Sequence, residues 1–192
     1  MANKRNTGFR PASEVCGRIP IFRFPVDASS GTALYVGDVV ANNAAGSVRP
    51  AAANAGVTAA GVCVAVYDSD GRPCGSQDSS VSTPNVLTAS TAGYADVALA
   101  LPGAIFRANF GATYTPTAAD IFGSVDHVAT AGDATVHRSN HVLGGAGGIN
   151  TEAQFQILGL VNDGNNAWGT YAEVYVRFLE SCWGQVNPTV GV

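Results

Sequence analysis

Residues 171–180, YAEVYVRFLE, alternate apolar and polar side chains over the length of one β-strand. Successive residues of a strand point to opposite faces, so a period of two puts one set of side chains in a core and the other in solvent. The stretch therefore predicts a half-buried strand and a protein built on β-sheet. The inward set is Ala172, Val174, Val176 and Phe178, and the outward set is Glu173, Tyr175 and Arg177.

Similar strand patterns recur along the chain. Residues 94–101 (YADVALAL) and 154–161 (QFQILGLV) alternate in the same way. Residues 61–68 (GVCVAVYD) are almost continuously apolar, which is typical of a strand buried on both faces. Together these patterns predict an all-β fold, a single β-sandwich or barrel-like domain. Turn signals rich in Gly, Asn, Asp and Pro punctuate the chain at 29–31, 42–46, 68–71, 101–103 and 162–166.

Loops and at most one short helix are expected between the strands. Residues 71–85 are rich in Ser and polar, and residues 139–150 carry four glycines in five positions, so both are predicted to be long surface loops. The helix is expected to begin with Thr115 as its N-cap and Pro116 as its first residue, and to end at Gly123.

The composition is apolar but poor in charge. Charged residues make up 12% of the 192 positions, about half the usual share. The apolar runs are far shorter than the roughly 20 residues of a membrane-spanning helix. The first residues lack the apolar core of a secretory signal, so we expect synthesis in a cytoplasm. Low surface charge indicates a building block that packs against other proteins more than a free-standing enzyme.

Charge is distributed unevenly. The first 23 residues carry a net charge of +4, whereas the rest of the chain carries −8. Two interpretations stay open, a solvated terminus or a basic arm that docks on an acidic surface. The predicted organisation is an extended basic N-terminal arm over residues 1–24 and one β-rich domain over residues 25–192. The low isoelectric point, about 5.2, and the single lysine argue against direct binding of nucleic acid.

The cysteines and histidines form no recognisable metal motif. The four cysteines make no C-x-x-C pair, and Cys63 and Cys74 flank a predicted hairpin turn at residues 68–71, where a cytoplasmic origin favours free thiols. His137 and His141 would lie about 13 Å apart in an extended segment, too far to share a metal ion. We therefore expect surface or loop histidines and no metal site.

Catalytic motifs are also not recognisable in the sequence. The serine-hydrolase elbow G-x-S-x-G, the dinucleotide loop G-x-G-x-x-G and the P-loop are not matched. The sequence DSDG at residues 68–71 resembles the start of a calcium loop but has no acidic residue at the twelfth position. We therefore predict no catalytic residue and no cofactor, and a protein that is not an enzyme.

Four stretches together resemble a known protein family. They are LYVGDVVANNAAGSVRPA at 34–51, AGVCVAVYDSDGRP at 60–73, YADVALALPGAIFRANFGATYTPTAADIFGSVD at 94–126 and FQILGLVNDG at 155–164. Their order and turn spacing are similar to those of the small head proteins of tailed phages that decorate or cement the capsid. The resemblance covers most of the chain, from about Leu34 to Val161.

The resemblance implies a β-rich virion protein that is made in the host cytoplasm and binds the outer surface of a capsid. Its implied partners are the major capsid protein and further copies of itself, with a trimer preferred. An N-terminal arm of this family commonly reaches neighbouring capsid subunits. In this chain the implied contacts are Lys4, Arg5 and Arg10, which would pair with carboxylates, and Phe9, which would be an apolar anchor.

Other functions stay open at the level of sequence. One alternative is another virion part, such as a β-domain of a tail or spike. A second is a carbohydrate-binding β-sandwich that uses Trp168, Tyr171 and the loop at residues 162–166 as a sugar platform. A third is a hydrolase whose acidic residues meet only in the folded protein.

Overall fold

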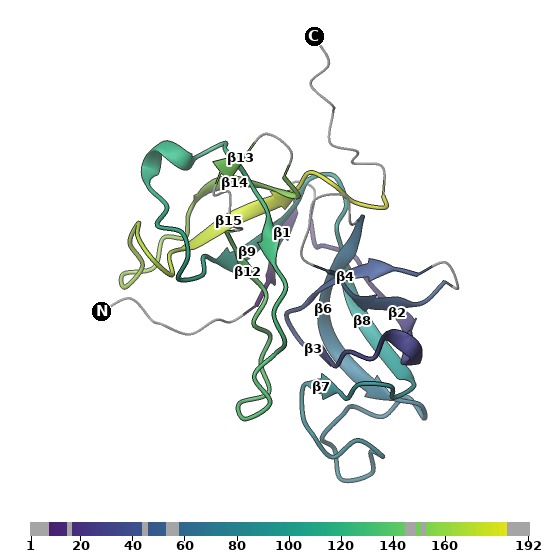
Figure 1. Ribbon diagram of the computed structural model, residues 1–192. Coiled ribbons are helices and arrows are strands. Elements are labelled where there is room, and N and C mark those ends of the chain that lie inside the picture. Colours follow the sequence, from purple (N-terminus) through teal and green to yellow (C-terminus); the bar gives the residue numbers. More distant parts are fainter. Residues whose placement is uncertain are drawn as a thin grey trace.

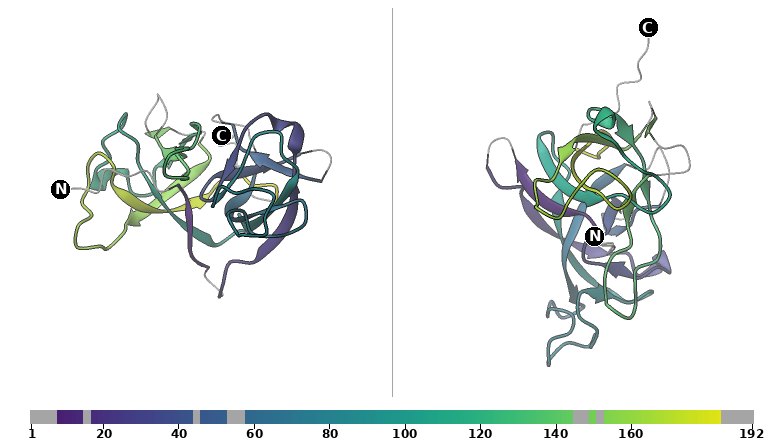
Figure 2. Two further views of the ribbon diagram at one scale, coloured as in Figure 1. Left: turned by 90° about the horizontal axis from the view of Figure 1, so that it is seen from below. Right: turned by 90° about the vertical axis from the view of Figure 1, so that its left-hand side faces the viewer.

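The fold is known from a computed structural model, which describes residues 8–14, 17–43, 46–52, 58–144, 149–150 and 153–183. It is all-β, as the sequence predicts, with 43% of the described residues in strands and 4% in helices. A closed five-stranded barrel and a six-stranded antiparallel sheet lie side by side (Figure 1; Figure 2, left). The predicted barrel-like architecture is therefore confirmed.

The barrel has the strand order β2-β5-β4-β6-β8. Its longest pairing joins β6 and β8, which run antiparallel from Gly61–Leu99 to Asp68–Gly93. The turn after Asp68 is a hairpin turn, as predicted, because Tyr67 pairs back with Pro73. The strands are β2 (Ile21–Val26), β4 (Val39–Asn42), β5 (Val48–Pro50), β6 (Ala59–Asp68) and β8 (Gly93–Leu99).

The six-stranded sheet has the order β1-β9-β15-β14-β10-β13. Its centre is the pairing of β15 with β14 on one side and with β9 on the other. The strand predicted from YAEVYVRFLE is thus the middle of this sheet. The strands are β1 (Arg10–Glu14), β9 (Ala104–Asn109), β10 (Ser124–Val125), β13 (Ile149–Asn150), β14 (Phe155–Leu160) and β15 (Glu173–Phe178).

Short elements complete the fold. The expected helix near residue 115 is only one 3-10 turn, and its N-cap is Thr117 and not Thr115. The predicted loop at residues 139–150 contains two short strands, so this expectation was wrong in part. The remaining elements are β3 (Leu34–Tyr35) with β7 (Val86–Leu87), β11 (His127–Val128) with β12 (Val142–Leu143), and the 3-10 turns η1 (Ala28–Ser30) and η2 (Ala118–Asp120).

Two apolar clusters share the barrel wall. One fills the barrel with side chains such as Val40, Cys63 and Val97. The other packs the opposite face of the same strands, including Val39 and Val62, against the phenylalanines of the six-stranded sheet. Both faces of β6 are therefore buried, which confirms the prediction from its continuous apolar sequence and explains why it has no polar alternation.

The described cysteines are free thiols. Cys63 and Cys74 are buried and Cys182 is half-buried, and burial raises the pKa of Cys74 to about 11. The thiol of Cys63 is buried in the barrel cluster, where it packs as a small apolar core residue. Cys16 lies outside the described residues.

The described part of the predicted N-terminal arm is built into both sheets. Arg10–Glu14 forms edge strand β1 on β9, and Ile21–Val26 is a barrel strand that pairs with β8. The sequence did not reveal β1 because an edge strand tolerates proline and polar residues, and Pro11 lies beside a bulge in this pairing. Residues 1–7 of the predicted arm lie outside the described residues.

Candidate functional site

Two of the four predicted contact residues can be placed. Phe9 is 1% exposed, its ring lies 4.9 Å from that of Phe155, and its N–H donates to the carbonyl of Gly37 at 2.8 Å. Phe9 therefore anchors the chain to its own core. The prediction that Phe9 is an apolar contact for a partner is corrected by this burial. Arg10 is exposed and pairs with Glu173. Lys4 and Arg5 lie outside the described residues.

Arg10 belongs to a larger group of polar side chains on the solvent side of the six-stranded sheet. The carboxylate of Glu173 binds two guanidinium groups, that of Arg10 through Oε1 and that of Arg107 through Oε2 at 2.9 Å. Cross-strand register places Arg107 opposite Tyr175, and Arg177 opposite Gln156. We call Arg10, Arg107, Gln156, Glu173, Tyr175 and Arg177 the arginine face.

The arginine face is basic in an otherwise acidic protein. Its three arginines and one glutamate give a net charge of +2, whereas the whole chain carries −4. Arg177 is exposed, and its Nε donates to Oε1 of Gln156 at 2.8 Å. Guanidinium groups bind carboxylates in paired hydrogen bonds, so this face is suited to an acidic protein surface.

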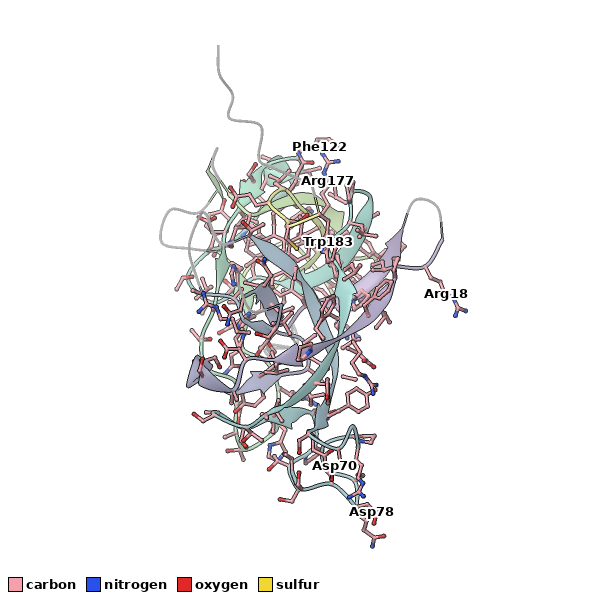
Figure 3. The ribbon with its side chains drawn as sticks, turned by 90° about the vertical axis from the view of Figure 1, so that its right-hand side faces the viewer. Arg18, Asp70, Asp78, Phe122, Arg177 and Trp183 are labelled. Atoms are coloured by element: carbon pink, nitrogen blue, oxygen red, sulfur yellow. The ribbon has the colours of Figure 1, made fainter. Side chains whose placement is uncertain are left out.

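Phe122 borders the arginine face. The residue is 72% exposed, the highest value among the large apolar residues that are exposed in the described part of the chain. Its backbone oxygen accepts a hydrogen bond from Nε2 of Gln156 at 3.0 Å, which links it to Arg177 through one side chain. Phe122 and Arg177 lie together at one end of the molecule, and Asp70 and Asp78 lie at the other (Figure 3).

A second polar cluster is buried between the barrel and the β11–β12 pair. His127 is 1% exposed in strand β11, so the prediction of a surface or loop histidine was wrong for it, whereas His141 lies in the loop before β12 but is only 4% exposed. Their ring centroids are 5.4 Å apart, and Asp38 in the turn before β4 is 2% exposed beside them. Strands β11 and β12 bring the two histidines together across the pair, a neighbourhood that sequence spacing does not reveal.

Hydrogen bonds orient this buried cluster. The N–H of Val39 donates to Nδ1 of His141 at 3.2 Å, so the proton of the neutral ring lies on Nε2, which is 3.7 Å from Oδ1 of Asp38. Oδ2 of Asp38 accepts from the N–H of Tyr35 at 2.8 Å. Nδ1 of His127 contacts Oε1 of Gln154. Through His141 the cluster connects the start of β4 to the segment before β12, and through His127 it connects β11 to the segment before β14.

Burial governs the protonation of the cluster. Desolvation raises the pKa of Asp38 to about 7, against the opposing effect of hydrogen bonds from Ser139 and Tyr35. Desolvation also lowers the pKa of His127 and that of His141 to about 4. Charged forms lose their hydration in an apolar interior, so each group moves towards its neutral form.

Asp38 and His141 also lie on a cleft of about 460 Å³ between the barrel and residues 129–132. Alanines line much of it, and Thr32, Thr130 and Arg49 are among the polar residues around it. The Nε2–H of His141 makes this nitrogen a donor, which does not suit a metal ion. In the described parts of the chain no group of three or more His, Cys, Asp or Glu side chains is placed to hold a metal.

The buried cluster predicts a loss of stability in acid. Between about pH 4 and 6.5 the unfolded chain binds two protons on His127 and His141, whereas the folded cluster holds one, on Asp38. The unfolded state binds one more proton, so acidification lowers the free energy of unfolding by about 1.4 kcal/mol per pH unit from this cluster. Urea unfolding curves across this pH range measure the slope.

Two variants test this proton count. His127→Gln should remove the contribution of the cluster, because both states then hold one proton. Asp38→Asn should double it to about 2.7 kcal/mol per pH unit, because the folded cluster then holds none. A slope that is the same in all three proteins would contradict the assignment.

Trp168 and the loop at residues 162–166, named above for a sugar platform, and the second tryptophan, Trp183, make contacts within the fold. Trp168 is half-buried against the core, and the side chain of Asn166 bonds the backbone of Val161 and Glu173, closing the β14–β15 connection. The indole N–H of Trp183 donates to the carbonyl of Ala60 at 2.7 Å, although the residue is 37% exposed. These residues therefore brace loops of the fold.

Comparison with protein-family models, with curated proteins and with solved structures finds no match to this chain. Among the described residues there is no helix with the length and apolar character to cross a membrane.

Proposed function

We propose that the protein is a non-enzymatic decoration protein that binds the outer surface of a phage capsid and stabilises the shell. The arginine face carries this proposal. It is a basic, solvent-facing sheet surface in a chain of net charge −4, and it begins at Arg10, one of the contacts that the family resemblance implies. Such a face favours an acidic protein surface as its partner through charge complementarity.

Hydrogen bonds within this face order its arginine side chains before any partner binds. The carboxylate of Glu173 fixes Arg10 and Arg107, and Gln156 fixes Arg177. Ordering these side chains before binding reduces the entropy that association costs. A rigid β-sheet that carries them also presents them at fixed spacing, set by the register of β1, β9, β15 and β14.

Shell stabilisation by such a protein needs no reaction. A ligand that binds only the assembled shell stabilises it by about 2.7 kcal/mol per site at a hundredfold excess over its Kd. Many identical sites on one capsid multiply this effect. We propose further that the protein is made in the host cytoplasm, joins the virion at the capsid surface, and associates with itself, preferably as a trimer.

Co-sedimentation with emptied heads of the parent phage that lack the protein tests this function. We expect saturable binding at a fixed ratio to the major capsid protein, weakened at high salt because charged contacts are screened. Arg177→Ala should weaken binding about tenfold, as arginine contacts in interfaces often do. Arg72→Ala, in the loop after β6, is the matched control and should bind normally. A folded protein that does not sediment with heads would refute the proposal.

A further inference from the structure

The backbone at Phe122 adopts a conformation that aromatic residues avoid. Its φ is +69°, in the left-handed region, where the side chain crowds its own carbonyl group. The surroundings impose this geometry from both sides. The N–H of Phe122 donates to the carbonyl of Ile157 at 2.8 Å, and the N–H of Ile157 donates to the carbonyl of Gly123 at 3.0 Å. The hydrogen bond from Gln156 to the Phe122 oxygen completes the clamp.

The fold itself gains nothing from a phenyl ring at this position. The residue is 72% exposed, so most of its apolar surface stays in water. A glycine would make the same backbone hydrogen bonds without the steric cost of a positive φ. Strained residues of this kind persist where they serve binding or a switch. Phe122 therefore has the features of an aromatic side chain held out for a partner.

The neighbours of Phe122 indicate the chemistry of that partner. Gln156 donates from Nε2 to the backbone carbonyl of Phe122 and accepts at Oε1 from the Nε of Arg177, so one amide links the main chain at Phe122 to the guanidinium group of Arg177. This pair continues the arginine face, whose net charge is +2. An apolar anchor beside an arginine is a common composition of the energetic centre of a protein interface.

We infer that Phe122, with Gln156 and Arg177, is the apolar anchor of the docking surface, and that it inserts into a phenyl-sized apolar recess bordered by a carboxylate on the capsid protein. This inference rests on the proposed function for the identity of the partner. The carboxylate follows from charge complementarity with Arg177, and the recess follows from the exposed ring. Phe122 thus takes the role that the sequence assigned to Phe9, whose ring is in the core.

Phe122→Gly separates binding from stability in the head co-sedimentation assay. This variant removes the ring and relieves the positive φ, so its melting temperature should equal or exceed that of the wild type. Its affinity for heads should fall at least about tenfold. Phe22→Ala is the matched control, because Phe22 is 56% exposed on the barrel strand β2, and it should bind heads like the wild type.

The outcomes separate the anchor from the function. Binding of wild type and Phe122→Gly with equal affinity overturns the anchor and leaves the decoration role intact. Failure of the wild type to bind refutes the proposed function, and the capsid as partner of this surface falls with it. The inference would also be overturned if the wild-type protein bound a single-stranded DNA oligonucleotide more tightly than heads and Phe122→Gly removed that binding. The partner of this surface would then be a nucleic acid.

Discussion

Gly61→Ala is expected to destabilise the protein by about 3 kcal/mol or more, and in practice to prevent the barrel from closing. Gly61 lies where β6 crosses between β4 and β8, next to a register shift in the β4–β6 pairing. A Cβ atom at this position would lie 2.1 Å from the carbonyl oxygen of Ala98 and 2.8 Å from Cγ1 of Val97. The first of these neighbours is backbone near the end of β8, where it pairs with β6, so the clash is relieved only by separating the two strands.

Urea unfolding or soluble yield measures this effect. Gly164→Ala is the matched control, because nothing lies within 4 Å of a Cβ at Gly164, in the loop between β14 and β15. That control should change the free energy of unfolding by less than about 0.5 kcal/mol. A Gly61→Ala protein as stable as this control would show that β6 and β8 do not approach each other as closely as the structure has them.

Phe9→Ala is expected to cost about 3–5 kcal/mol of stability, the usual range for a buried phenylalanine. The Phe9 ring packs against Phe155 and, edge-on at 6.4 Å, against His127, so its removal leaves a cavity between the sheet and the buried polar cluster. The same substitution would leave stability unchanged if the first residues were a free arm. Thermal unfolding therefore distinguishes a structural Phe9 from a contact residue.

Arg10→Ala is the control for Phe9→Ala. Arg10 follows Phe9 directly but is exposed, and an exposed ion pair contributes at most about 1 kcal/mol. The two variants should thus differ by several degrees in melting temperature. Equal melting temperatures would contradict the burial of Phe9.

The strands with clear patterns were predictable from sequence. Alternation in residues 171–180 identified β15, and the same pattern identified β8 and β14, because over most of its length each has one buried face and one partly exposed face. The continuous apolar run of β6 predicted a strand buried on both faces, because this strand separates two apolar clusters. Local sequence encodes burial of this kind directly.

Other features depend on contacts that sequence spacing does not show. Strand β1 is a polar edge strand without alternation, and His127 and His141 become buried only because β11 and β12 pair. Phe122 looked like the end of a helix, yet the hydrogen bonds of Ile157 and Gln156 hold it in a left-handed conformation. The alternation of residues 173, 175 and 177 correctly placed these side chains on the face opposite the core, where Arg177 is exposed and Glu173 and Tyr175 are half-buried.

The most direct test of the decoration role is electron cryomicroscopy of parent phage heads saturated with the protein. We expect extra density at one kind of position on the outer shell, into which the barrel and the six-stranded sheet fit with the arginine face and Phe122 against the capsid protein. Heads without added density, at concentrations where the protein is folded, would contradict the account.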